Sequence, residues 1–368
     1  MRFLMLNWRD MENPKHGGAE RVTQGYLAAL ARRGHEVYWY SEAFEGCAPT
    51  AEMDGVKVVR GGRNIVSRMI LARKWYRRQP QFDLVIDQHH GVPWYAPWWC
   101  GTHCISYIHE VLGSIWGTFY KGWRAPVAVL GPMQERLTLR LYRNVPFWTA
   151  CESTEKALRA NGVRYIKRIP YGVHTVALPY LEPKKLGTPL KLAFVSRLAP
   201  NKRVDHAICA VQILSQKGID VHLKVAGGGD SYNDLKRLVA DLRLENIVEF
   251  TGFISEEEKN AMLKETHFLL HTSVREGWGL NVIEANAMGT PTAVYPAEGL
   301  TESTLKDVTG IISDEQTPES LAECILSHLN DQAFYDRIRV AAWERAKTFH
   351  WSQVLPLACD WLESQAKK

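Results

Sequence analysis

Short apolar runs alternate with segments of helical period along the whole chain, and this alternation constrains the fold more than any other feature. The pattern is typical of parallel sheets that helices cover on both faces. In the first half it predicts strands at Phe3–Leu6, Glu36–Tyr40, Val56–Arg60, Leu84–Asp87, Cys104–Ile108, Phe147–Ala150 and Ile166–Ile169. It predicts helices over Gly18–Arg33, Val66–Arg78, Gly131–Tyr142 and Thr154–Asn161.

The alternation is interrupted at residues 178–189, where proline and lysine residues without a clear period indicate a linker. It then restarts, with strands predicted at Lys191–Val195, His222–Ala226, Ile247–Phe250, Phe268–His271, Pro291–Val294 and Gly310–Ile312. Helices are predicted over Arg203–Gln216, Tyr232–Leu242, Glu256–Glu265, Leu280–Met288, Pro318–Asn330, Ala333–Phe349 and Trp351–Glu363.

A chain of 368 residues is longer than a single hydrophobic core usually supports. We therefore predict an α/β protein with two doubly wound, Rossmann-like domains, residues 1–177 and 178–349, followed by a terminal helical segment, residues 350–368. In such sheets, ligands bind outside the carboxyl ends of the strands.

Composition narrows the class of protein. A net charge of +5 suits an anionic small ligand or weak attraction to anionic lipid, but is too diffuse to indicate nucleic-acid binding. The cysteines, seven and scattered, indicate reduced thiols in a cytoplasm. Because no apolar run approaches the ~20 residues that span a bilayer, we expect a cytoplasmic protein, soluble or peripheral at the membrane. Cys100, His103, Cys104 and His109 hint at metal-ligand spacing but lack a second Cys-x-x-Cys partner, so we expect no metal site.

Two glycine turns fall between a predicted strand and the helix that follows it. The first contains Gly17 and Gly18, which permit close approach of the backbone to phosphate or sugar. It is not a G-x-G-x-x-G motif, and no ribose-binding acid follows at the expected offset, which excludes a nicotinamide site. The second turn, around Gly228, could lie beside a nucleotide. A tight structural turn is the alternative explanation for both.

Candidate ligand-binding side chains also follow predicted strands. Arg197 and Lys202 lie after the strand at 191–195, and a guanidinium fork with an ammonium group suits a diphosphate. Solvated surface cations are the alternative. His109 closes the strand at 104–108, where it faces the ligand edge of the sheet unless it is a hydrogen-bonded core histidine.

The segment 275–291 combines two glutamates with two glycines and the start of a helix. Its glycines permit close backbone approach, and the helix that opens near Leu280 offers unpaired N–H groups and a positive dipole end to a diphosphate. Glu284, one turn inside that helix, can accept hydrogen bonds from ribose hydroxyls, and Glu276 can face a sugar. The pattern predicts a nucleotide-sugar pocket, against the alternative of a capped amphipathic helix with surface acids.

In this combination and order, the motifs resemble those of the retaining glycosyltransferases of family 4, and the resemblance covers essentially the whole chain. It rests on the Gly-Gly-Ala-Glu-Arg turn at 17–21, His109, the Tyr-Gly-Val-His run at 171–174, Ser196-Arg197 with Lys202, and the pair Glu276 and Glu284. The resemblance implies the GT-B fold, in which two doubly wound domains face each other across a cleft. It also implies that residues 1–177 form the acceptor-side domain, that residues 178–349 bind the nucleotide sugar, and that the last helix, residues 350–368, crosses back onto the N-terminal domain.

The resemblance also implies roles for these residues. Arg197 and Lys202 match the pair that holds the donor diphosphate, Glu276 the acid near the transferred sugar, and His109 the histidine beside that sugar; these four are the candidate catalytic residues. Glu284 matches the ribose-binding acid. The other implied donor-binding positions are Gly17, Gly18, Ser196, Gly228, Gly277, Gly279, Leu280 and Asn281.

The implied activity is that of a retaining hexosyltransferase in polysaccharide or glycolipid biosynthesis. Its donor would be a UDP- or GDP-linked sugar and its acceptor a hydroxyl of a glycan or lipid-linked molecule, with no cofactor and no required metal because two cations take the metal's place. A same-fold nucleotide-sugar epimerase or sugar-phosphate synthase, and a non-catalytic binding partner, are the alternatives.

Some positions depart from the family pattern. Glu110 stands where the family often has Asp, and Tyr171 and His174 stand where it often has Asn and Asp, which leaves the role of Glu110 and the details of the hinge open. Residues 115–124, with Arg136, Arg140 and Arg143, mix aromatic and cationic side chains. Such a surface suits peripheral membrane contact, carbohydrate stacking or ordinary domain packing.

Overall fold

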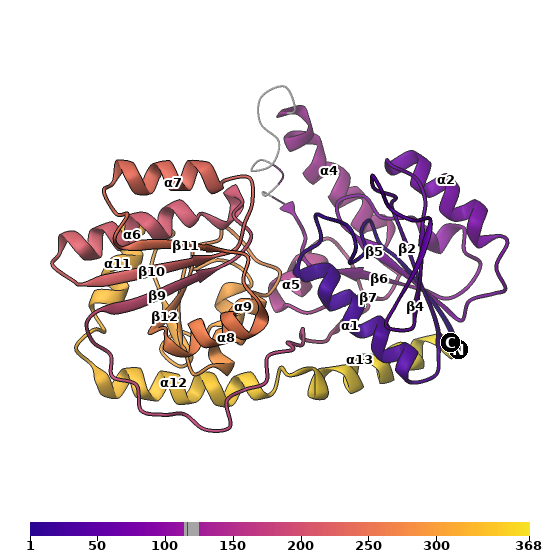
Figure 1. Ribbon diagram of the computed structural model, residues 1–368. Helices are drawn as coiled ribbons and strands as arrows, with labels where there is room; N and C mark the ends of the chain where they lie inside the picture. The colour runs from indigo at the N-terminus through magenta and orange to yellow at the C-terminus, as the bar shows by residue number, and fades with distance from the viewer. Residues whose placement is uncertain (114–115, 117–124) are drawn as a thin grey trace. The chain divides into compact units, whose positions relative to one another are not determined.

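The computed structural model describes residues 1–113, 116 and 125–368. The chain forms two compact units (Figure 1). The N-terminal unit contains Met1–Gly172 together with Ser352–Lys368, and the C-terminal unit contains Val173–Trp351.

The N-terminal unit is built on an 8-stranded sheet with the order β3-β4-β2-β1-β5-β6-β7-β8. Its strands are β1 (Arg2–Leu6), β2 (Glu36–Ser41), β3 (Thr50–Met53), β4 (Val56–Arg60), β5 (Leu84–His89), β6 (Cys104–Ile108), β7 (Phe147–Thr149) and β8 (Ile166–Arg168). All neighbouring strands pair in parallel except β3, which runs antiparallel to β4. Strand order therefore reverses between β1 and β5, which is where a doubly wound sheet binds its ligand.

Among the described residues, the α-helices of this unit are α1 (Gly18–Arg32), α2 (Ile65–Tyr76), α4 (Ala125–Leu141), α5 (Glu152–Ala160) and, from its second residue on, α13 (Trp351–Ala366). In α1 the side chains of Val22, Tyr26 and Leu30 recur at helical spacing and are fully buried. The terminal helix α13 is held against the same unit, where Trp361 contacts Trp148 and Arg33 forms ion pairs with α13.

The C-terminal unit has a 6-stranded, fully parallel sheet with the order β11-β10-β9-β12-β13-β14. Its strands are β9 (Leu190–Val195), β10 (Val221–Ala226), β11 (Val248–Gly252), β12 (Phe268–His271), β13 (Thr292–Val294) and β14 (Gly310–Ile312). This is the strand order of a Rossmann domain, and it reverses between β9 and β12.

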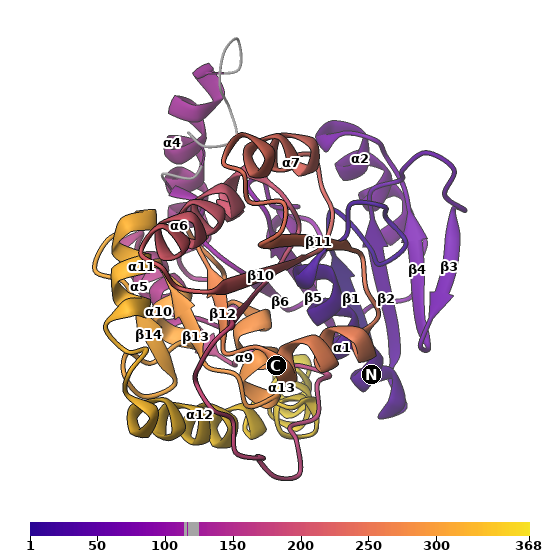
Figure 2. The same ribbon diagram turned by 60° about the vertical axis from the view of Figure 1, so that its left-hand side comes forward.

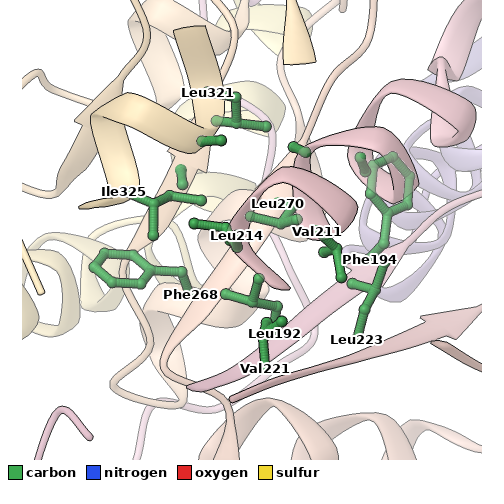
Figure 3. Packing of buried hydrophobic residues seen from close by; sticks show 14 of the residues in the cluster. Leu192, Phe194, Val211, Leu214, Val221, Leu223, Phe268, Leu270, Leu321 and Ile325 are labelled. Atoms are coloured by element: carbon green, nitrogen blue, oxygen red, sulfur yellow. The ribbon is translucent and has the colours of Figure 1, made fainter. Parts of the chain in front are cut away.

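Helices cover both faces of this sheet (Figures 1 and 2). One group comprises α6 (Val204–Gln216), α7 (Tyr232–Asp241) and α11 (Pro318–Leu326), and the other α8 (Glu256–Glu265), α9 (Leu280–Ala287) and α12 (Gln332–Lys347). The short α10 (Leu300–Ser303) precedes β14. Figure 3 shows part of the core, where leucine, valine and phenylalanine side chains of β9, β10 and β12 pack against α6 and α11.

The predicted fold class, two doubly wound α/β units, is confirmed, and most predicted elements lie within a few residues of the observed ones. β3 was not predicted, because its side chains alternate between exposed and half-buried and so carry no apolar signal. The predicted start of α4 at Gly131 was wrong. Gly131-Pro132 resembles a helix start, yet the helix begins at Ala125 and continues through Pro132. No helix in the described ranges combines the length and apolar character needed to cross a bilayer.

Candidate functional site

The carboxyl edge of the C-terminal sheet gathers most of the predicted donor-binding residues. Arg197 follows β9, the glycine run at 227–229 follows β10, and the loop that contains Glu276 follows β12. Because β9 and β12 are hydrogen-bonded neighbours, these loops flank the point where strand order reverses. The topology therefore brings together residues that are up to 88 positions apart in sequence, from Ser196 to Glu284.

Lys202 and Glu276 form an ion pair in which the ammonium group donates to Oε1 of the carboxylate. Ser273 Oγ donates to the same oxygen at 2.7 Å, and His271 Nε2 lies 3.6 Å from it. The two paired side chains are 17% and 14% exposed, so the pair is only partly screened by water. Burial alone would raise the pKa of Glu276, but Lys202, His271 and Ser273 outweigh it and lower that pKa to about 2. Glu276 is therefore ionised throughout the physiological pH range.

Arg197 is the other predicted cation, and its side chain is exposed at the same edge. Within the described part of the chain, its guanidinium group has neither a hydrogen bond nor an ion pair. The structure thus separates the two cations into one that is held by a carboxylate and one that is free to meet an anion.

The helix α9 begins at Leu280, as predicted from the sequence. Gly279 precedes it in the left-handed conformation, with φ of +85°, which a residue with a Cβ rarely adopts. Asn281 donates from Nδ2 to the carbonyl of Val195 at 2.7 Å and so ties the first turn to the end of β9. The first-turn N–H groups of α9 therefore lie at the edge where Arg197 also emerges.

Glu284 lies in the second turn of α9 and is paired with Lys259 of α8, whose Nζ donates to Oε2 at 2.9 Å. Lys259 is 8% exposed on its side chain and also contacts Glu256. Burial would lower the pKa of Lys259, but the two glutamates outweigh it and raise that pKa. The pair fixes one carboxylate oxygen of Glu284 and leaves the other for hydroxyl donors.

An exposed aromatic side chain stands beside the glycine run. Phe253 directly follows β11 and is 89% exposed. A Cβ on Gly228 would lie 2.6 Å from the phenylalanine ring, so the ring lies directly over this glycine. Ser196 adjoins this run, since its backbone N–H bonds to Ala226 and a Cβ on Gly227 would meet the Ser196 carbonyl at 1.9 Å.

In the N-terminal unit, His109 follows β6 and is bonded through Nδ1 to the hydroxyl of Tyr171 at 2.5 Å. Burial, with a smaller effect of His90, lowers the pKa of His109 to about 3, so the ring is neutral at physiological pH. Its Nε2 atom is shielded from water and has no hydrogen-bond partner among the described residues. A histidine that is fixed through one ring nitrogen and unpaired at the other can form a hydrogen bond with a ligand hydroxyl.

Tyr171→Phe is expected to change the tautomer of His109 and to reduce turnover by roughly three- to tenfold, the value of one hydrogen bond. If the tyrosine hydroxyl donates to Nδ1, the proton of the neutral ring lies on Nε2 in the parent protein. ¹⁵N NMR of the imidazole reports this directly. Unchanged ¹⁵N shifts in the variant would show that Tyr171 does not position His109.

The glycines after β1 occupy the start of α1. Gly17 is the residue before the helix and donates its N–H to Glu20 Oε2 at 2.7 Å, and Gly18 is exposed in the first turn. They lie at the carboxyl edge of the N-terminal sheet, as His109 does.

Sequence analysis missed Lys259, Phe253 and the contact of Tyr171 with His109. Lys259 lies in a charged helix, where a buried ion pair has no sequence signature. Phe253 lies three residues after the predicted strand at 247–250, and an aromatic residue that close to a strand end could have drawn attention to it. The 115–124 stretch lies outside the described residues, apart from Trp116, which is buried. No cluster of three or more His, Cys, Asp or Glu side chains suited to a metal ion occurs within the described ranges.

Two families match the chain. Residues 182–345 match the family described as Glycosyl transferases group 1, and residues 16–177 match Glycosyltransferase Family 4. The first match contains the carboxyl-edge residues of the C-terminal unit, and the second contains His109, Tyr171 and both glycines after β1.

Curated relatives include a poly(glycerol-phosphate) alpha-glucosyltransferase of Bacillus subtilis, 26% identical over 48% of this chain and 26% of the relative. A 2-deoxystreptamine glucosyltransferase of Streptomyces kanamyceticus is 32% identical over 41% of this chain and 40% of the relative. The chain therefore aligns with less than half the length of these proteins. A glycogen synthase of Mycobacterium tuberculosis is 28% identical over 96% of this chain and 92% of its own length.

Solved structures share the fold over the whole chain. A sucrose-phosphate synthase from Thermosynechococcus elongatus has a TM-score of 0.79 at 19% identity and is covered, like this chain, over 100% of its length. Anabaena HepE in complex with UDP-glucose has a TM-score of 0.76 at 17% identity, with 99% of this chain and 100% of that chain covered. At these identities the likeness shows the GT-B fold alone.

Proposed function

The chain belongs to the family 4 glycosyltransferases with a group 1 C-terminal domain, and from this premise we propose that it is a retaining hexosyltransferase. It would move a hexosyl unit from a nucleoside diphosphate sugar to a hydroxyl of a glycan or lipid-linked acceptor. The single observation that carries the proposal is the convergence of the free Arg197, the paired Lys202 and the start of α9 at the point where strand order reverses.

Transfer of a glycosyl group leaves negative charge on the departing diphosphate, and the proposed catalysis is electrostatic stabilisation of that charge. Arg197 supplies a bidentate guanidinium, Lys202 an ammonium group, and α9 backbone donors. With these cations in place, we propose that the reaction needs no divalent metal. The departing phosphate would take the proton of the attacking hydroxyl on the same face of the sugar, which retains the anomeric configuration.

Three further side chains would bind the sugars of the donor. Glu276, held ionised by its neighbours, would accept from hydroxyls of the transferred sugar, and Glu284 would accept from the ribose. His109 is neutral and unpaired at Nε2, and through this atom it would form a hydrogen bond with a hydroxyl of the transferred sugar.

The exposed ring of Phe253 is suited to stack on the base of the donor nucleotide. Stacking of an aromatic ring on a base contributes about 1–3 kcal/mol, so Phe253→Ala is expected to raise the donor KM roughly 5- to 150-fold with a small change in kcat. Phe253→Tyr keeps the ring and is the matched control. Equal donor KM values for the alanine variant and the parent would place the base elsewhere.

Thermal-shift screening against UDP-, GDP- and ADP-sugars tests the proposed function. A donor at a hundred times its Kd stabilises the folded protein by about 2.7 kcal/mol and raises the melting temperature. The HepE structures contain UDP or UDP-glucose, which makes UDP-glucose the first compound to try. Incubation of the protein with the stabilising donor, but without acceptor, distinguishes a glycosyltransferase from an epimerase, because an epimerase would convert the donor alone. If no nucleotide sugar shifts the melting temperature, the proposed function is wrong.

A further inference from the structure

Helix α4 of the N-terminal unit is fixed by one of its faces. Glu135 on that face accepts hydrogen bonds from the N–H groups of Leu112 and Gly113, both at 2.8 Å. Just beyond the helix, Tyr142 donates its hydroxyl to Asp87 at 2.7 Å. Leu139 is buried in the same core cluster as Tyr142. These contacts determine which side chains of α4 point away from the unit.

The outward face of α4 is aliphatic. Its most exposed aliphatic side chains are Val129 (75%), Leu130 (57%), Met133 (58%), Leu137 (56%) and Leu141 (54%). At 3.6 residues per turn they fall within about one third of the helix circumference, so they form a continuous stripe. We call this set the α4 stripe. A stripe of large apolar side chains on the surface of a protein marks an interaction site.

Cations border the α4 stripe. Arg136 lies beside Val129 at one margin of the stripe, and Arg140 lies between Val129 and Met133 on the helix circumference. Arg143 follows the end of the helix, and all three arginines are exposed. Their guanidinium groups have no hydrogen-bond or ion-pair partner in the described ranges. The only acid between residues 125 and 143 is Glu135, which is 6% exposed and faces inward. The exposed surface of α4 therefore combines aliphatic side chains with positively charged ones and carries no exposed acid.

Helix α2 repeats this composition in the same unit. Val66 and Ile70 are 67% and 60% exposed, and residues 63–79 contain no acid but several arginines and a lysine. In Figures 1 and 2, α2 and α4 both lie at the upper side of the N-terminal unit. Two helices that combine exposed aliphatic side chains with an excess of cations thus occur on one side of one unit.

We propose that this side of the N-terminal unit docks on an anionic membrane surface, with the α4 stripe in the acyl boundary and the bordering arginines at the lipid phosphates. Aliphatic side chains beside snorkelling cations are the composition of helices that lie in a membrane interface. A second copy of this chain fits poorly, because a symmetric pair of stripes would bring like-charged arginine rows together with no acid to offset them. Docking depends on no step of the proposed transfer reaction.

Co-sedimentation with vesicles tests the proposal without donor or acceptor. The full chain is expected to bind vesicles of phosphatidylcholine mixed with phosphatidylglycerol, to bind phosphatidylcholine alone far more weakly, and to be released by salt. The triple variant Arg136→Ser/Arg140→Ser/Arg143→Ser is expected to lose roughly a hundredfold in vesicle affinity. Leu137→Ser/Leu141→Ser, which keeps every charge, is expected to lose roughly tenfold or more.

The matched control is Arg32→Ser/Arg164→Ser/Lys167→Ser, which removes the same charge from exposed positions elsewhere in the N-terminal unit. It is expected to retain most of the affinity. The proposal is overturned if the parent does not bind anionic vesicles, if the control loses as much affinity as the α4 triple variant, or if the leucine variant binds like the parent. Sedimentation velocity adds one more test, since a dimer that Leu137→Ser dissociates would assign the stripe to a second copy instead.

Discussion

Arg197→Ala is expected to lower kcat by about 10²–10³ and to leave the melting temperature unchanged. The side chain is exposed and has no partner in the described part of the chain. Its removal therefore leaves no other described group without a hydrogen-bond or ion-pair partner. In the proposed reaction, Arg197 stabilises the negative charge that develops as the diphosphate leaves. Steady-state kinetics with the donor identified by thermal shift, together with a melting curve, measures both effects.

Lys217→Ala is the control for this variant, because Lys217 is an exposed lysine at the far end of α6. It should match the parent in both measurements. If Arg197→Ala turns over at the parent rate, the guanidinium does not stabilise the leaving group and the proposed catalysis loses its main component.

Lys202→Ala is expected to lower kcat by a similar factor and, in addition, to destabilise the C-terminal unit by about 2 kcal/mol or more. The difference from Arg197 arises because removal of Lys202 leaves the mostly buried carboxylate of Glu276 without its main partner. Adding Glu276→Gln removes the stranded charge. The double variant should therefore recover much of the lost stability and none of the lost turnover.

The pH dependence of this stability has a definite sign. The pKa of Glu276 is lowered from the ordinary 4.5 to about 2, so its pairing stabilises the fold above about pH 4.5 and is lost as the pH falls through about 2. The parent and Lys202→Ala should thus differ most in stability at neutral pH. If the double variant recovered turnover as well as stability, Lys202 would have a structural role only.

The fold could be predicted from the sequence because nearly every apolar run corresponds to an observed strand and nearly every segment of helical period to an observed helix. It also predicted the loops of the C-terminal unit, since glycines and charged residues stand where strands end. Arg197, Lys202 and Glu276 are brought to one edge as the resemblance implied, although their roles stay predictions.

The remaining features depend on packing between distant segments. Lys259 reaches Glu284 from a neighbouring helix 25 positions earlier, and Tyr171 reaches His109 across 62 positions. No local pattern encodes such contacts. Pro132 differs from these long-range contacts, because proline usually marks the start of a helix and here lies inside α4. The neighbouring Gly131 packs tightly against Trp116.

The most direct measurement is a crystal structure of the protein with the nucleoside diphosphate that gives the largest thermal shift. We predict that the diphosphate oxygens contact Arg197, Lys202 and the first-turn N–H groups of α9, with the ribose hydroxyls on Glu284. A diphosphate bound away from the edge between β9 and β12, with Arg197 and Lys202 turned from it, would contradict the proposed function.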